Sequence, residues 1–151
     1  MVPASLGVMA FPGLASAVTP GPATCSAISL KVVKTSATLN LSKCTDTANT
    51  GGAGTIKATT LVGKGAQTVV ITWASGGTTT TSLTVFKGEK DKDATGKACS
   101  TAKGHSEYEA TGTVKSDTGK GSSIKVGGKV SAELCAVGVT VTLEPGTVFT
   151  V

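Results

Sequence analysis

The chain has 151 residues, a length that forms a single domain with one hydrophobic core. Hydrophobic residues make up 39% of it, and threonine runs such as 78–81 favour strands, which excludes overall disorder. The net charge of +5 comes from lysine without any arginine, and aromatic residues are only 3%. The chain therefore lacks the guanidinium groups and stacking surfaces that nucleic-acid binders use, and we expect no nucleic-acid partner.

The N-terminal residues have the features of an export signal. A short apolar run at 6–14 precedes Ala15-Ser16-Ala17, which has the form of an A-x-A cleavage site. This pattern predicts a leader over residues 1–17 and a linker over 18–23, although no basic residue precedes the run. A disordered apolar N-terminus is the alternative. The run is too short to cross a bilayer as a helix, so no integral membrane span is expected.

Four cysteines, Cys25, Cys44, Cys99 and Cys135, give the even count that disulfide pairing requires. Their spacing contains no C-x-x-C motif, and the chain has one histidine, so two disulfides are favoured over a zinc site of four thiolates. Together with the leader, the cysteines predict a secreted protein, extracellular or associated with the cell envelope.

The first predicted hairpin has a specific register. Residues 28, 30 and 32 share one apolar face, as do residues 37, 39 and 41. A turn at Lys34-Thr35 places Leu30 opposite Leu39, and the same register places Cys25 opposite Cys44. Of the three possible connectivities, this favours Cys25–Cys44 with Cys99–Cys135.

Further strand patterns recur along the rest of the chain. We expect strands through residues 56–62, 69–73, 83–85, 108–114, 124–134, 137–143 and 148–151, with an irregular segment at 86–104. In the second hairpin, matching the apolar faces pairs Ile71 with Leu83 across a loop at 76–78 and directs Trp73 inward. The expected fold is all-β, an antiparallel sandwich or barrel of about 8–9 strands with two disulfides, occupying residues 24–151 as a single domain.

Residues 91–96 resemble the opening of a calcium-binding loop. Asp91, Asp93 and Thr95 supply oxygen atoms at the first, third and fifth positions. The twelfth position is Ala102, where such a loop requires a bidentate glutamate. A solvated loop is the favoured interpretation, and these residues are a weak metal candidate.

Two other groups are candidates for hydrolytic chemistry. His105 is the only imidazole, but no G-x-S-x-G motif accompanies it. Glu107 and Glu109 share one face of a strand at a separation of roughly 6–7 Å, which a glycosidase pair can have. Pairing with Lys125 and Lys129 on the next strand is the favoured interpretation. We therefore assign no catalytic residue and expect neither enzymatic activity nor a cofactor.

The Ile71-Thr72-Trp73 segment with its glycine turn and threonine-rich return, Cys44 at a strand end, and Gly127-Gly128 before Cys135 resemble small secreted β-proteins of actinobacteria. The resemblance covers most of residues 24–151. It implies export and a β-sandwich or barrel, and it supplies no site residues.

These observations favour a non-enzymatic extracellular or cell-envelope domain with a structural or surface-interaction role. The sequence identifies no specific partner. Another extracellular protein and the cell wall are the two candidate partners. The alternative is a β-barrel that binds a small apolar ligand, because small inward residues leave space in a barrel; these are Ala58, Ala110, Gly112 and Ala132. A hydrolase that uses His105 or Glu107 and Glu109 is the third interpretation.

Overall fold

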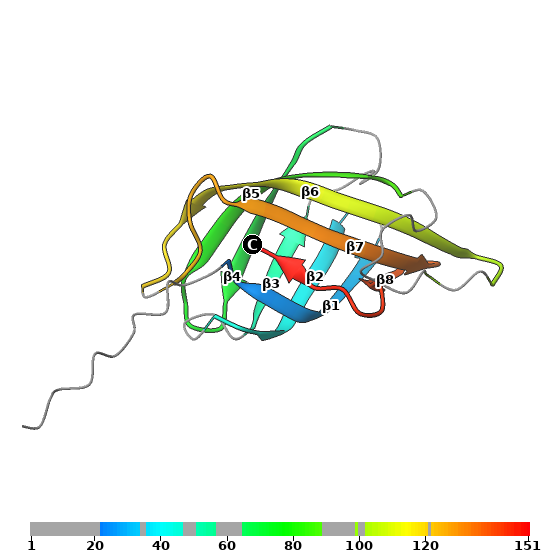
Figure 1. Ribbon diagram of the computed structural model, residues 1–151, viewed down its shortest axis with the longest axis horizontal. Coiled ribbons are helices and arrows are strands. Elements are labelled where there is room, and N and C mark those ends of the chain that lie inside the picture. The colour runs from blue at the N-terminus through cyan, green and yellow to red at the C-terminus, as the bar shows by residue number, and fades with distance from the viewer. Residues whose placement is uncertain are drawn as a thin grey trace, which may run out of the picture.

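The computed structural model describes residues 22–33, 36–46, 51–56, 65–88, 99, 102–120 and 122–151. These residues form nine strands and no helix (Figure 1). The strands are β1 (Thr24–Val33), β2 (Ser36–Cys44), β3 (Gly52–Ile56), β4 (Gln67–Trp73), β5 (Thr78–Lys87), β6 (His105–Asp117), β7 (Lys129–Val137), β8 (Thr140–Leu143) and β9 (Phe149–Thr150). In the described part of the chain, no helix is long and apolar enough to span a membrane.

The sheet closes on itself. From β1 to β8, each strand pairs antiparallel with the next one in the sequence, and β8 pairs back onto β1. The result is an up-and-down barrel, the second of the two architectures that the sequence allows. Strand β8 is short, and β9 pairs with both β1 and β7 in the same region. The prediction of an all-β antiparallel fold with two disulfides is confirmed.

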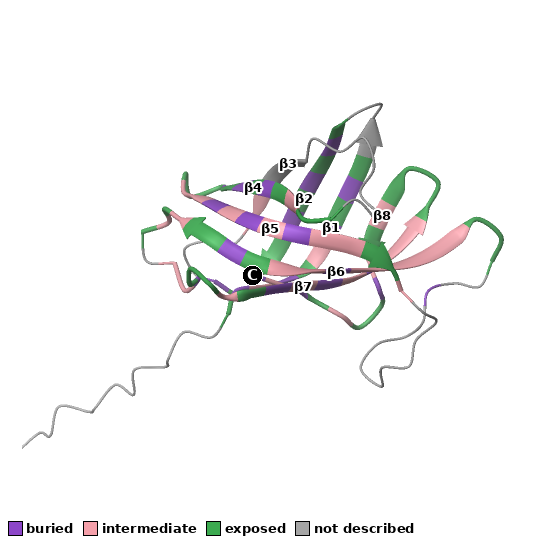
Figure 2. Ribbon diagram, turned by 90° about the horizontal axis from the view of Figure 1, so that it is seen from above, coloured by how far each residue is buried: buried purple, intermediate pink, exposed green. Residues whose placement is uncertain are grey.

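Burial alternates along the strands, as a barrel with one apolar face per strand requires. Over residues 36–42 of β2 and 68–73 of β4, every second residue is buried and the residues between are exposed, which Figure 2 shows as alternating purple and green. The largest fully buried side chains are Trp73, Phe149 and Ile71. The inward position of Trp73 that the sequence predicts is therefore confirmed.

The register of the first hairpin is confirmed. Leu30 lies opposite Leu39, and Cys25 lies opposite Cys44. The bond joins Cys25 to Cys44 with an S–S distance of 2.01 Å, and Cys99 is bonded to Cys135 at 1.91 Å. The predicted turn at Lys34-Thr35 lies outside the described residues. The alternating apolar residues of the two strands were sufficient to set this register, since a shift of one residue would turn the apolar residues of one strand to the outer face.

The predicted register of the second hairpin is wrong. Ile71 lies opposite Thr79, not Leu83, and Leu83 lies opposite Gln67. The loop also lies two residues earlier than expected, at 74–76, because the Trp73 amide donates to the Gly77 carbonyl at 2.8 Å. The error arose because apolar residues were matched with apolar residues, whereas this barrel buries threonines on its inner face.

The strand predicted over residues 124–134 begins later than expected. β7 starts at Lys129, and a turn precedes it in which Gly127 has φ of 83°. The Gly127 amide donates to the Val114 carbonyl at 2.8 Å, which folds residues 124–128 back against the end of β6. Ala58 and Val62, which the sequence places in the third strand, lie outside the described residues.

Candidate ligand-binding site

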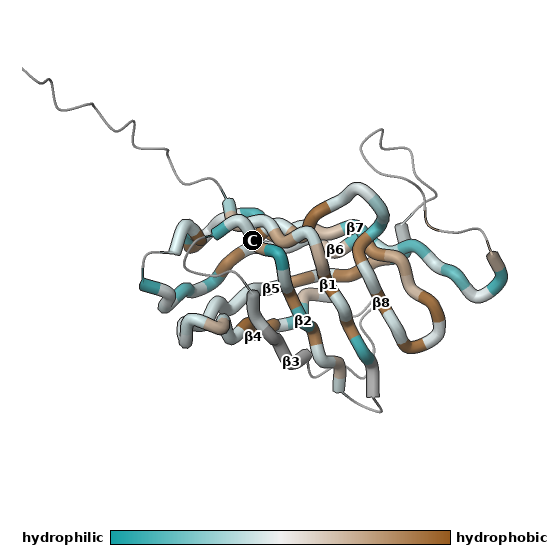
Figure 3. Tube along the Cα trace, turned by 90° about the horizontal axis from the view of Figure 1, so that it is seen from below, coloured by the Kyte–Doolittle hydropathy of each residue, from teal (hydrophilic) through white to brown (hydrophobic). Residues whose placement is uncertain are grey.

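An apolar cavity of about 200 Å³ lies within the barrel. Strands β1, β2 and β5 to β9 supply its walls. Figure 3 shows that hydrophobic segments recur along the strands. The described lining residues are Ile28, Leu30, Leu39, Leu83, Val85, Tyr108, Ala110, Ala132, Leu134, Ala136, Gly138, Val141 and Phe149. Of these, only Tyr108 carries a polar group on its side chain.

The cavity exists because small side chains meet where strands pair. Ala110 on β6 lies directly opposite Ala132 on β7, and both line the cavity. Two methyl groups at this position fill much less of the lumen than the leucine and valine side chains around them. The sequence-based expectation that Ala110 and Ala132 face an interior space is confirmed.

Gly112 has a different role from the one that the sequence suggests. It does not line the cavity. A Cβ atom at this position would lie 1.9 Å from the carbonyl oxygen of Ser82 on β5. The missing side chain therefore allows β5 and β6 to approach closely, near the register shift at Thr80/Thr81. Ala58, the fourth small residue, is outside the described part of the chain.

Hydrogen bonds among buried and half-buried residues fill one end of the barrel. The Trp73 Nε1 donates to Thr79 Oγ1 at 2.7 Å, and that hydroxyl donates to Asp117 Oδ1 at 2.5 Å. The backbone amide of Gly119 donates to Asp117 Oδ2 at 3.2 Å. These residues lie where β4 and β6 end and β5 begins, so the cavity is displaced toward the opposite end of the barrel.

At that opposite end the cavity reaches the surface. Gly138 lines the cavity and is exposed, and it lies in the turn between β7 and β8. Ala136 and Val141, which pair across this turn, are half-buried lining residues, as are Val85 and Tyr108. We call these five residues the rim. Within the described residues, the lumen is thus packed at one end and accessible at the other.

The second disulfide and three acidic residues lie on the outside of the barrel. Cys135 lies opposite Glu107, and Glu133 lies opposite Glu109, on the face away from the lumen. The expected pairing of the glutamates with lysines is wrong, because Lys129 lies opposite Thr113 and Lys125 precedes the strand. β7 begins too late in the sequence to place these lysines opposite Glu107 and Glu109.

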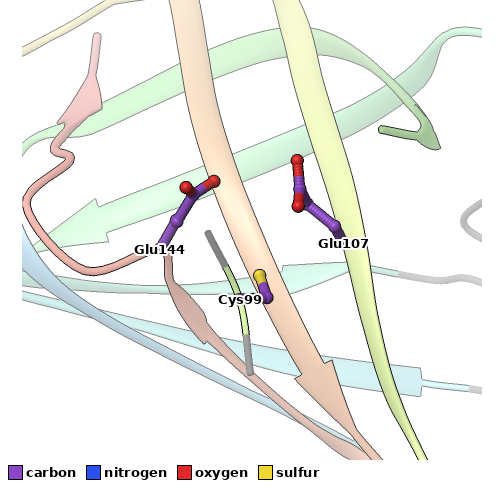
Figure 4. Close-up of side chains that lie close together, drawn as sticks. All are labelled: Cys99, Glu107 and Glu144. Atoms are coloured by element: carbon purple, nitrogen blue, oxygen red, sulfur yellow. The ribbon is translucent and has the colours of Figure 1, made fainter. Parts of the chain in front are cut away.

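Figure 4 shows Glu107, Glu144 and Cys99 converging on this outer face. Their potential ligand atoms all lie within 4.8 Å of one another, and Glu144 is only 2% exposed. The Cys99 sulfur is bonded to Cys135, so it cannot provide the thiolate that binds a metal ion. Two carboxylates remain, and this group does not make a zinc site.

The other candidate residues are not brought together. His105 begins β6, is half-buried and lies opposite Val137. The possible calcium ligands Asp91, Asp93 and Thr95 lie outside the described residues, so that prediction stays untested. The four cysteines form the two predicted disulfides.

Tyr108 and Phe149 also line the cavity and were not predicted to do so. The alternation of Tyr108 with Ala110 along one strand was the available signal for the first of them. No family model, curated protein or solved structure matches this chain. The relationship to actinobacterial secreted proteins therefore remains a prediction.

Proposed function

We propose that this protein is an exported, non-enzymatic domain that binds a small apolar ligand in the lumen of its barrel. The observation that supports this function is the apolar cavity of about 200 Å³ that reaches the surface at Gly138. An empty cavity in a core lowers stability, because its lining side chains lose their packing contacts. A purely structural module has no need of such a cavity, whereas a binding protein does.

The volume limits the size of the ligand. An apolar cavity of about 150 Å³ holds benzene. In proportion, a cavity of about 200 Å³ accommodates an apolar body of about eight non-hydrogen atoms. A monocyclic alkylbenzene or a short branched chain fits this limit, whereas a long fatty acid or a sterol exceeds it.

The disulfides support export. Such bonds persist in oxidising compartments, and the two here are consistent with an extracellular environment. We include secretion, with cleavage after Ala17, in the proposal. A surface-interaction role with a second extracellular protein or the cell wall is the other candidate, and the exposed Val137 and Val139 beside the rim favour it.

The proposed function is tested by calorimetric titration with propylbenzene, a hydrocarbon close to this limit whose chain end can reach the opening at Gly138. We expect saturable binding to the natural protein and none to Ala132→Leu, whose larger side chain occupies the lumen. Thr113→Leu, an exposed residue on the outer face of β6, is the matched control and should bind normally. Absence of binding by the natural protein contradicts the proposal. Hydrolytic activity that is lost in His105→Ala or Glu107→Gln would also contradict it.

A further inference from the structure

We propose that the ligand is a small carboxylic acid, with its apolar body in the lumen and its carboxylate at the rim. The carboxylate oxygens accept hydrogen bonds, and Tyr108, Lys87 and Ser106 supply the donor groups. This inference rests on the proposed function and specifies the chemical class of the ligand.

The position of Tyr108 provides the first argument. Its side chain lines the cavity and is half-buried, near the accessible end of the lumen. A phenol hydroxyl at an otherwise apolar wall offers a hydrogen bond to one polar group of a ligand. A ligand that is apolar throughout would leave this group without a partner on binding.

Lys87 provides the second argument. It lies directly opposite Tyr108 in the pairing of β5 with β6. Residues opposite each other in an antiparallel pair direct their side chains to the same face of the sheet. Lys87 is therefore on the lumen side at the end of β5, two residues beyond the lining residue Val85. Its ammonium group is exposed and places a positive charge at the rim.

Ser106 completes the set of donors. It lies opposite the lining residue Ala136, so it shares the lumen side with Tyr108, two residues away on β6. A hydroxyl, a phenol and an ammonium group can all donate hydrogen bonds, and an ionised carboxylate only accepts them. The three groups thus match an anionic head better than a cationic one.

The acidic residues of this region face the other way. Glu107 lies opposite Cys135 and Glu109 lies opposite Glu133, on the outer face of β6 and β7. Among the described rim and strand-end residues on the lumen side, none is acidic. A carboxylate at the rim therefore meets attraction from Lys87 without a neighbouring negative charge on the same face.

The experiment compares two probes with the same apolar body, 4-phenylbutanoate and propylbenzene, by calorimetric titration of the full chain. In Tyr108→Phe the affinity for 4-phenylbutanoate should fall about tenfold, because a hydrogen bond to a charged group is lost. In Lys87→Met it should fall about two- to fivefold, and its dependence on sodium chloride should weaken. The affinity for propylbenzene should stay the same or rise in Tyr108→Phe, which removes a hydroxyl that this ligand leaves without a partner, and stay unchanged in Lys87→Met. Retained binding of propylbenzene also shows that both variants are folded.

Lys115→Met is the matched control, since Lys115 is exposed and lies on the outer face of β6 beside the inward Val114. It removes one positive charge, as Lys87→Met does, and should leave the affinities for 4-phenylbutanoate and propylbenzene unchanged. If propylbenzene binds and 4-phenylbutanoate does not, or if neither rim variant weakens the acid selectively, the carboxylate assignment is wrong and the proposed function stands. If neither probe binds to the natural protein, the proposed function itself fails.

Discussion

The indole nitrogen of Trp73 donates a hydrogen bond of 2.7 Å to the hydroxyl of Thr79, and both side chains are buried. Thr79 in turn donates to Asp117 at the end of β6, so three strands are joined by side-chain hydrogen bonds at one end of the barrel. A buried indole NH is costly without an acceptor, and Thr79 supplies one. This relationship explains why a threonine, not a leucine, faces Ile71 across the second hairpin.

Replacing Thr79 with valine tests the importance of this pair. The change keeps the shape of the side chain and removes the acceptor for Trp73, so we expect a loss of about 1–3 kcal/mol in unfolding free energy. Urea denaturation followed by fluorescence of the single tryptophan measures it. Thr80→Val, at the neighbouring half-buried position, should cost much less. Equal losses in the two variants would contradict the stabilising role of the Trp73–Thr79 hydrogen bond.

Gly112→Ala should destabilise the barrel. The added Cβ would meet the Ser82 carbonyl at 1.9 Å, and neither backbone can move without disturbing the β5–β6 pairing. We expect a loss of about 1–3 kcal/mol, as for other overpacked positions, measurable by thermal unfolding. At Gly88 an added Cβ would lie 3.4 Å from the Glu107 side chain, an ordinary contact. Gly88→Ala is thus the control, and a comparable loss there would refute the steric explanation.

A larger side chain should affect stability differently in the cavity and at a position that is already packed. Ala110 lines the cavity, whereas Ala37 is 1% exposed and does not line it. We expect Ala110→Leu to change the unfolding free energy by less than about 1 kcal/mol or to raise it, because the new atoms enter existing space. Ala37→Leu should lower it by about 1–3 kcal/mol. The reverse order in chemical denaturation would show that the lumen is already filled.

Both disulfides should be present in the purified protein. Digestion without reduction followed by mass spectrometry should yield peptides that link Cys25 to Cys44 and Cys99 to Cys135. The double variant Cys25→Ser with Cys44→Ser should lose roughly 3 kcal/mol of stability, since the bond closes a loop of 19 residues. Four free thiols that bind zinc would contradict both the pairing and the export proposal.

The sequence predicted the first hairpin to the residue and the second one incorrectly, for a physical reason. In β1 and β2 the inward residues are apolar, so the hydrophobic pattern alone sets the register of Leu30 against Leu39. In β5 the inward residues include Thr79 and Thr81, both fully buried. Their hydroxyls make hydrogen bonds that join β5 to its neighbours, and such bonds cannot be seen in a hydrophobicity pattern.

The candidate site was predicted only in part. Small inward residues indicated an interior space, and Ala110 and Ala132 do line it. The positive charge beside the rim was not predicted, because Lys87 belongs to a segment without clear periodicity and acquires its position only from the pairing of β5 with β6. The same strands could form a sandwich or a barrel, and only the barrel has a lumen. The barrel forms because β8 pairs with β1.

The closure of β8 onto β1 has a consequence for the order of folding. The first strand finds its final neighbours only in the last residues of the barrel, where Cys25 lies opposite Phe149 and Leu30 opposite Val141. Contacts that join segments so distant in the chain form late and slow the overall reaction. The emerging chain therefore cannot complete its barrel before the C-terminal strands have been synthesised. Until then β1 lacks its β8 partner, and the lumen stays open along that edge of the sheet.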